Sequence, residues 1–183
     1  MSTFFTIVLS VFMLFGSPLL AQAAAVPDVA VLPGLKGVFT GDRPTNLGVT
    51  DGKLAVCPST PNCVVSQDAD EEHAIAPIAY TGDTATAKAN IIDILGVVPR
   101  TKIIEQTDSY ILAESESRLM GFVDDTEFYF PQDESSIQVR AAARMGESDL
   151  GVNRRRIEQI RLAFADLTQQ SSAESADKEP ASP

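Results

Sequence analysis

The sequence predicts an α+β fold, in which an antiparallel β-meander of about five strands is joined to two helices and the C-terminal helix packs on the apolar sheet face. The main observation is the stretch 121–157, which alternates apolar and polar side chains like two paired strands, turns, and enters a basic helix. Before it, apolar side chains recur at helical spacing over 84–96, and two alternating runs follow over 101–116. At 183 residues and 44% apolar content, the chain is one domain with appendages.

The first residues are typical of an exported protein. Residues 1–27 carry no charged side chain, an apolar run covers 4–15, and the alanines at 21 and 23–25 offer cleavage sites. This pattern predicts a signal peptide at 1–25, because small residues follow an apolar segment of suitable length. The alternative is an uncleaved membrane anchor, for which the apolar run before Pro18 is short. Both interpretations predict export.

The rest of the chain divides into an arm, a domain and a tail. Residues 26–56 are rich in Gly and Pro and show no helical or strand period, which predicts an extended arm lying over the domain. Residues 57–167 form the single α+β domain. Residues 168–183 contain no Leu, Ile, Val, Met or aromatic residue, which predicts a disordered tail.

The two cysteines, Cys57 and Cys63, are predicted to form a disulfide. Neighbouring cysteines of an exported protein usually join, and the C-x5-C spacing matches neither redox nor zinc motifs. The alternative is a metal or redox pair, but His73 is the chain's one histidine, so no metal site is predicted. Closing so short a loop contributes on the order of 2 kcal/mol, which indicates a role in local shape.

The elements of the domain follow from local signals. Residues 75–80 are a candidate strand, and Asp83 is placed to cap a helix that Gly96 ends. Two alternating runs, 101–107 and 110–116, then form a hairpin around the turn between them. This hairpin leads directly into the central one.

The final helix is predicted to run from about Leu150 to Leu167, with Asp149 or Asn153 as its cap. Its apolar stripe is expected to face the phenylalanine side of the sheet and consists of Ile157, Ile160, Phe164 and Leu167.

Arginines flank the apolar stripe of this helix. At 100° per residue, Arg154 and Arg161 lie on its two borders. Their aliphatic stems are expected to lie on the edge of the sheet, so that the guanidinium groups reach a carboxylate, with Asp124 as the candidate.

The central hairpin determines its own register, because a slip of one residue would bury its charged side chains and expose its phenylalanines. Closing the loop over 131–136 produces these neighbours: Phe128 opposite Val139, Glu127 opposite Arg140, and Asp125 diagonal to Arg140 and Arg144. One face of the sheet is therefore predicted to be core and the other an array of ion pairs.

Several separated motifs occur in a fixed order: CP at 57–58, PNCV at 61–64, GFVDD at 121–125, EF at 127–128 and SDLGVNRRRI at 148–157. Together they resemble the signature of the domain of unknown function 1499 family, over roughly Leu47 to Leu167. The resemblance implies no settled activity. The arm is similar to members from photosynthetic organisms, which implies a periplasm or thylakoid lumen, with secretion as the alternative.

Composition and motifs exclude some classes of partner. The formal net charge is −11 and the isoelectric point is about 4.4, whereas nucleic acids and anionic membranes attract clustered Lys and Arg. Neither nucleic acid nor membrane beyond the signal segment is therefore a predicted partner. Neither a P-loop nor a dinucleotide fingerprint occurs, so no cofactor is predicted.

A candidate binding patch consists of Asp125, Glu127, Arg140, Arg144, Asp149, Asn153 and Arg154. Asp125 and Glu127 share a strand face, as two carboxylates in acid/base catalysis would. Arginines beside them would hold both ionised, whereas a catalytic acid needs a raised pKa. No catalytic residue is therefore assigned, and a hydrolase using this pair is the weakest hypothesis. The set is interpreted as a structural array, with the binding of an anionic group as the alternative.

Two hypotheses of function follow. The first is a small exported accessory module that binds a protein partner through the charged sheet face and the stiff cysteine loop. The alternative is a binder of a small apolar or anionic ligand in a sheet–helix cavity, lined by Met120, Phe122, Phe128 and Phe130.

Overall fold

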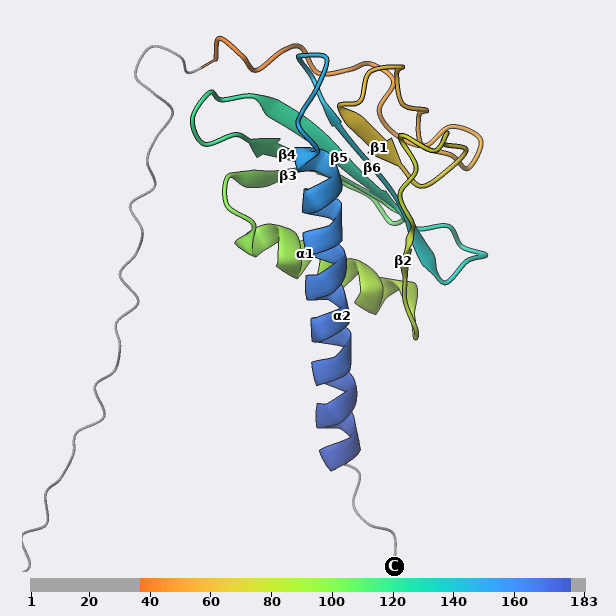
Figure 1. Cartoon of the computed structure of the whole chain (residues 1–183). Helices are drawn as coiled ribbons and strands as arrows, with labels where there is room; N and C mark the ends of the chain where they lie inside the picture. The colour runs from red at the N-terminus through yellow and green to blue at the C-terminus, as the bar shows by residue number, and fades with distance from the viewer. Residues whose placement is uncertain (1–36, 179–183) are drawn as a thin grey trace, which may run out of the picture.

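The computed structural model describes residues 37–178 and contains an antiparallel sheet with the arm on one face and both helices on the other (Figure 1). The predicted signal peptide, the first part of the arm and residues 179–183 of the predicted tail lie outside the described residues. The elements are β1 (Cys63–Val65), β2 (Ile78–Ala79), α1 (Thr84–Val97), β3 (Thr101–Gln106), β4 (Tyr110–Glu116), β5 (Val123–Tyr129), β6 (Ser136–Ala143) and α2 (Val152–Lys178).

The sheet has the strand order β1-β6-β5-β4-β3, and β2 pairs separately with β6. Strands β3 to β6 form the predicted meander. In the central hairpin Phe128 pairs with Val139 and Glu127 with Arg140, as the alternation predicted. Strand β1, which the sequence did not indicate, runs antiparallel to β6 along its other side. The predicted α+β meander with two helices is confirmed.

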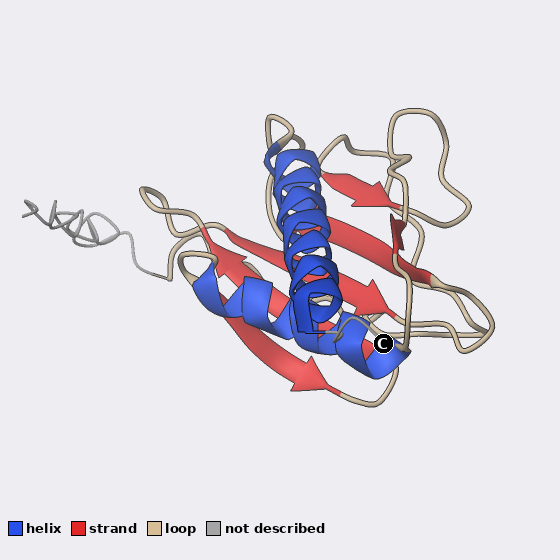
Figure 2. Cartoon of the chain, turned by 90° about the horizontal axis from the view of Figure 1, so that it is seen from below, coloured by secondary structure: helices blue, strands red, loops and turns tan. Residues whose placement is uncertain are grey.

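Both helices cover the same face of the sheet (Figure 2). Asp83 caps α1 by accepting a hydrogen bond from the amide of Thr86 at 2.8 Å. The core between sheet and helices includes Phe128, Phe130, Val139, Ile91, Ile94, Ile157, Ile160 and Phe164, each at most 4% exposed. The C-terminal helix therefore packs on the phenylalanine face, as predicted.

Helix α2 continues to Lys178, so its predicted end at Leu167 is wrong. The hydroxyls of Thr168 and Ser171 donate back to the carbonyls of Phe164 and Leu167, both at 3.0 Å. The prediction relied on the loss of large apolar side chains after residue 167. That loss removes packing against the sheet but leaves the backbone free to continue as a helix. Figure 1 accordingly shows the end of α2 projecting beyond the sheet.

The predicted strand at 75–80 is reduced to the two residues of β2. The reason is that arginines of α2 donate hydrogen bonds to the backbone carbonyls of the residues before β2. Arg154 donates to the carbonyls of Glu72 and Ala74 at 2.8 and 2.6 Å, and Arg161 to those of Ala76 and Pro77 at 2.5 and 2.6 Å. Carbonyls bound in this way are satisfied without a partner strand. The expectation that Arg154 or Arg161 reaches Asp124 is therefore wrong, since both bind this segment.

The described part of the arm lies over the sheet face opposite the helices. Leu54 is buried there with Val65, Tyr110 and Leu112 in a second, smaller core. The arm approaches the end of β6 closely at Gly41, where a Cβ atom would lie 2.8 Å from Met145 Cγ. Since Gly41 also has a φ of 63°, glycine suits this position on both counts.

Cys57 and Cys63 form the predicted disulfide, with Cα atoms 5.6 Å apart. A disulfide fits an oxidising compartment. Within the described chain, neither helix combines the length and the apolar character that crossing a bilayer requires.

Candidate functional site

Glu127 lies under the arm at the centre of the sheet and is fully buried. Its carboxylate accepts hydrogen bonds from Arg140 Nη1 at 2.9 Å, from the Tyr110 hydroxyl at 2.8 Å and from the Gly48 amide at 2.8 Å. Burial and the Glu127 charge raise the pKa of Tyr110, which keeps its hydroxyl a donor. Arg140 is 3% exposed, so the buried charges of Glu127 and Arg140 each need the other as a partner to offset the cost of leaving water.

A second series of charges begins at Asp125, whose side chain is 1% exposed. Arg144 donates to both of its oxygens, from Nε at 2.8 Å and from Nη2 at 2.7 Å, and these bonds raise the pKa of Arg144. Arg144 also binds Glu114, to which Arg43 of the arm donates at 2.9 Å. Burial would raise the pKa of Glu114, but the two arginines outweigh burial and lower it.

The charged face of the sheet is therefore present but closed. The side chains of Asp125, Glu127, Arg140 and Arg144 are between 0% and 8% exposed, and each is bound by a partner within the chain. A substrate or an anionic ligand has no access to them in this conformation. Two of them link the arm to the sheet: Glu127 accepts from the Gly48 amide, and Arg144 shares Glu114 with Arg43 of the arm.

A third group of polar residues lies on the opposite face, at the start of α2. Arg156 donates from Nη2 to Asp124 Oδ2 at 2.8 Å and from Nη1 to Asn153 Oδ1 at 2.5 Å. Asn153 is fully buried and donates to the carbonyl of Asn62 at 3.3 Å. Arg156 is the partner of Asp124 because it lies one helical turn before Ile160, on the side of α2 that faces the sheet. Burial raises the pKa of Asp124 more than Arg156 lowers it.

The β6–α2 loop (144–151) is held by hydrogen bonds and presents Leu150 to solvent. Asp149 accepts from the amides of Gly151 and Asn153 at 2.9 and 2.7 Å, Ser148 accepts from the amide of Leu150 at 3.2 Å, and Arg155 donates to the carbonyl of Leu150 at 2.9 Å. Asp149 is thus a cap of the helix, as predicted. Leu150 has a φ of 54° and is 83% exposed. For a residue with a Cβ atom this left-handed conformation costs about 1–2 kcal/mol.

An apolar hollow with a volume of about 140 Å³ lies between this loop and the β4–β5 turn (117–122). Its lining includes Ser117, Phe122, Asp124, Ala143, Met145 and Val152. Phe122 also packs on Phe39 of the arm, with ring centroids 5.0 Å apart. The arm, the sheet and α2 therefore all meet at this end of the sheet.

Exposed apolar side chains concentrate around the hollow. Of the eleven large apolar side chains that are exposed in the described chain, five belong to the β4–β5 turn, the β6–α2 loop or the first residue of α2: Leu119, Met120, Met145, Leu150 and Val152. Single exposed apolar residues are ordinary, but a group of them marks an interaction surface. We call these five residues and the hollow the apolar end.

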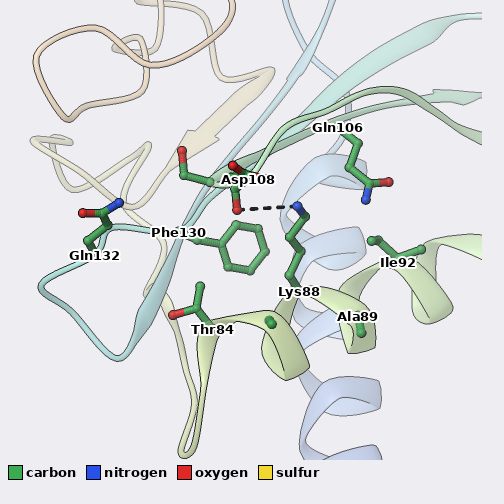
Figure 3. A pocket seen from close by; sticks show the side chains of 10 residues that line it. Thr84, Lys88, Ala89, Ile92, Gln106, Asp108, Phe130 and Gln132 are labelled. Carbon is green, nitrogen blue, oxygen red and sulfur yellow. Dashed lines mark hydrogen bonds between the residues drawn. The ribbon is translucent and has the colours of Figure 1, made fainter.

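A larger groove, of about 640 Å³, lies between α1 and the β3–β4 turn (Figure 3). Lys88 reaches across it and donates to the carbonyls of Thr107 and, at 3.5 Å, Asp108. The four residues predicted to line one sheet–helix cavity lie apart: Phe130 borders this groove, Phe122 lines the hollow, Phe128 is in the core and Met120 is in the β4–β5 turn.

His73 is buried behind the disulfide loop between two acceptors. Its Nδ1 lies 2.8 Å from an oxygen of Asp70, and its Nε2 lies 3.2 Å from the carbonyl of Thr60. Only the protonated imidazolium donates at both nitrogens. Burial alone would lower the pKa of His73, but Asp70 and Thr60, with a contribution from Glu72, outweigh it and raise the pKa.

We expect the protein to lose stability as the pH rises through the folded-state pKa of His73. Because that pKa is raised, protonation stabilises the fold; the contribution is complete below the unfolded value of 6.5 and is lost above the folded value. Urea unfolding from about pH 5.5 to 8.5 should show a falling midpoint, and His73→Gln should remove most of this dependence. A wild-type midpoint that rises over the window would contradict this assignment.

The structure separates the candidate patch that the sequence predicted. Four of its members lie under the arm, Asp149 and Asn153 lie at the start of α2, and Arg154 binds the backbone before β2. Sequence reasoning missed the hollow and the role of Arg156. The one signal for Arg156 is its spacing of four residues before Ile160.

Comparison with known proteins identifies one family. The model of a family described as protein of unknown function (DUF1499) matches residues 53–164, which include both hairpins, the disulfide and the part of α2 up to Phe164. Neither a curated protein nor a solved structure matches the chain.

Proposed function

The chain belongs to the DUF1499 family, whose description assigns no activity, and we propose that it is an exported accessory module that binds a protein partner through its apolar end. The disulfide supports export, to a periplasm or thylakoid lumen or outside the cell. The charged sheet face, which the sequence favoured as the docking surface, is covered by the arm. We propose the apolar end as the docking surface instead, because apolar side chains of the β4–β5 turn and the β6–α2 loop are exposed there.

The conformation of Leu150 is the observation that carries this proposal. Leu150 is 83% exposed and its backbone is left-handed. A hydrogen bond from its amide to Ser148 and one from Arg155 to its carbonyl hold the loop in place. The leucine at this position is neither buried in the core nor suited to the left-handed backbone, so the stability of the fold does not explain it. Strained residues that surrounding bonds hold in place cluster at functional sites. A pre-organised apolar side chain also loses little entropy when a partner covers it.

Replacing Leu150 by asparagine tests the proposal. Asparagine tolerates the left-handed conformation, so the free energy of unfolding should change by less than about 0.5 kcal/mol. Partner binding should fall about tenfold or more, because the exposed apolar side chain is lost. The measurement is crosslinking in intact cells from a photoreactive amino acid placed at position 147, three residues before Leu150 in the same loop.

Two controls make the result specific. Leu162 is 66% exposed on α2, so Leu162→Gln should leave crosslinking unchanged, and a photoreactive residue at the exposed position Asp93 of α1 should capture nothing in common with position 147. Undiminished crosslinking of Leu150→Asn, or no adduct at position 147 of the wild-type chain, would exclude docking through the apolar end.

The alternative function, binding of a small anionic ligand, is supported by the groove in Figure 3. Its volume of about 640 Å³ falls within the range of about 300–1,000 Å³ that is usual for ligand sites. Lys88 would supply the charge. Native mass spectrometry of the chain purified from its natural source distinguishes partner binding from ligand binding. A small additional mass that stays bound to the chain would favour ligand binding.

A further inference from the structure

Of the two carboxylate oxygens of Asp124, one has a hydrogen-bond partner within the described chain. Its side chain is 9% exposed, and Arg156 binds one oxygen, Oδ2. The other oxygen, Oδ1, accepts a hydrogen bond from no residue of the described chain. This oxygen is accessible to solvent, so a donor from another molecule can reach it and replace water there.

The open oxygen belongs to the hollow of the apolar end. Asp124 contributes to the wall of the hollow, together with apolar side chains such as Phe122, Met145 and Val152. Ser117 and Ser148 also line it, and each of their hydroxyl oxygens accepts one hydrogen bond from a backbone amide and has a second lone pair left. The volume of about 140 Å³ is well below that of usual ligand pockets, and it suits a single side chain.

We propose that the partner inserts a lysine side chain into this hollow, with its ammonium group donating to Asp124 Oδ1. This inference rests on the proposed docking at the apolar end. A lysine has an aliphatic stem, which suits the apolar walls, and three donors at a compact head, which suit one carboxylate oxygen and neighbouring hydroxyls. The planar guanidinium of an arginine prefers two parallel acceptors, and Asp124 offers one.

The surrounding charges favour a cation on balance. Arg156 opposes it, but its charge is already engaged by Asp124 and Asn153. Asp149 and Asp125 lie close enough to destabilise the ionised form of Asp124, so a further positive charge beside it is favourable. The formal charge of −11 over the whole chain also attracts a basic partner.

The first test uses n-butylammonium as a mimic of the lysine side chain. In methyl NMR spectra, the resonances of Val152 and Met145 should shift saturably with n-butylammonium and not with n-butanol or butanoate. Asp124→Asn should weaken the interaction about tenfold or more, because the replacement is neutral. Glu147→Gln, an exposed acid of the same loop, is the matched control and should leave the interaction unchanged.

A second variant covers the case in which Asp124→Asn fails to fold, since it leaves Arg156 without its partner. Ala143→Ile fills the hollow from β6 and keeps the ion pair, and a β-branched residue suits a strand. It should also abolish the shifts. Saturable binding of n-butylammonium that survives Ala143→Ile, or no binding to the wild-type chain, overturns the inference and leaves Oδ1 to solvent.

Crosslinking from position 147 separates this inference from the proposed function. If Ala143→Ile retains full crosslinking while Leu150→Asn loses it, the partner docks at the apolar end without a lysine anchor, and the inference alone fails. If the wild-type chain gives no adduct at position 147, the proposed function fails.

Discussion

Replacing Arg140 by alanine is expected to lower the free energy of unfolding by about 3–5 kcal/mol, and the melting temperature by about 10–20 °C. The reason is the complete burial of Glu127, whose charge then remains out of water with only Tyr110 and Gly48 as donors. Thermal unfolding followed by circular dichroism measures the change.

Arg43→Ala is the matched control for this experiment. Arg43 also binds a carboxylate, that of Glu114, but its side chain is 48% exposed, so its loss should cost at most about 1 kcal/mol. A double variant, Glu127→Gln with Arg140→Met, should recover much of the lost stability, because it removes the unpaired charge and keeps an acceptor for Tyr110. If Arg140→Ala melts within a few degrees of the wild type, the buried pair is not structural.

The second large effect is expected for Phe164→Ala, which should cost about 3–5 kcal/mol. Phe164 is 2% exposed and belongs to the core between α2 and the sheet. Leu162→Ala is the control, since it removes a large apolar side chain from the same helix at a position that is 66% exposed. We expect it to change stability by less than about 0.5 kcal/mol. Equal effects of the two variants in urea unfolding would mean that α2 is not docked as described.

These two effects concern different faces of the sheet. Arg140 belongs to the face that the arm covers, whereas Phe164 packs on the face that the helices cover. The sheet is thus buried on both sides, and five of the eleven exposed large apolar side chains of the described chain lie in the turn and loop at one end of its strands or at the start of α2. This distribution is why the proposed docking surface lies at the apolar end rather than on a sheet face.

The central hairpin was predictable in detail because its alternation has two faces of opposite character. The pairing of Phe128 with Val139 and of Glu127 with Arg140 follows from that alternation together with the closure of the loop over 131–136. Local signals were also sufficient for Asp83 as a cap and narrowed the cap of the final helix to Asp149 or Asn153, of which Asp149 takes that role, since a cap depends on residues within one helical turn.

Predictions failed where contacts between distant segments decide the structure. The strand expected at 75–80 was shortened by arginines from α2, more than seventy residues later in the chain, which no local pattern records. The partner of Asp124 was misassigned because the choice among neighbouring arginines depends on the rotation of α2 against the sheet. Strand β1 was missed because three residues next to a disulfide carry too little alternation to be recognised.

The sequence by itself determined the α+β class, the strand register of the central hairpin, the disulfide and the helix packing, because periodicity and spacing specify which side chains share a face. Which segments cover each face of the sheet was decided by the tertiary structure alone. The arm covers the charged face and closes it to ligands, while Leu150 and the open oxygen of Asp124 come together at one end of the sheet. Accessibility is a property of the whole fold, and a binding site depends on accessibility as much as on residue type.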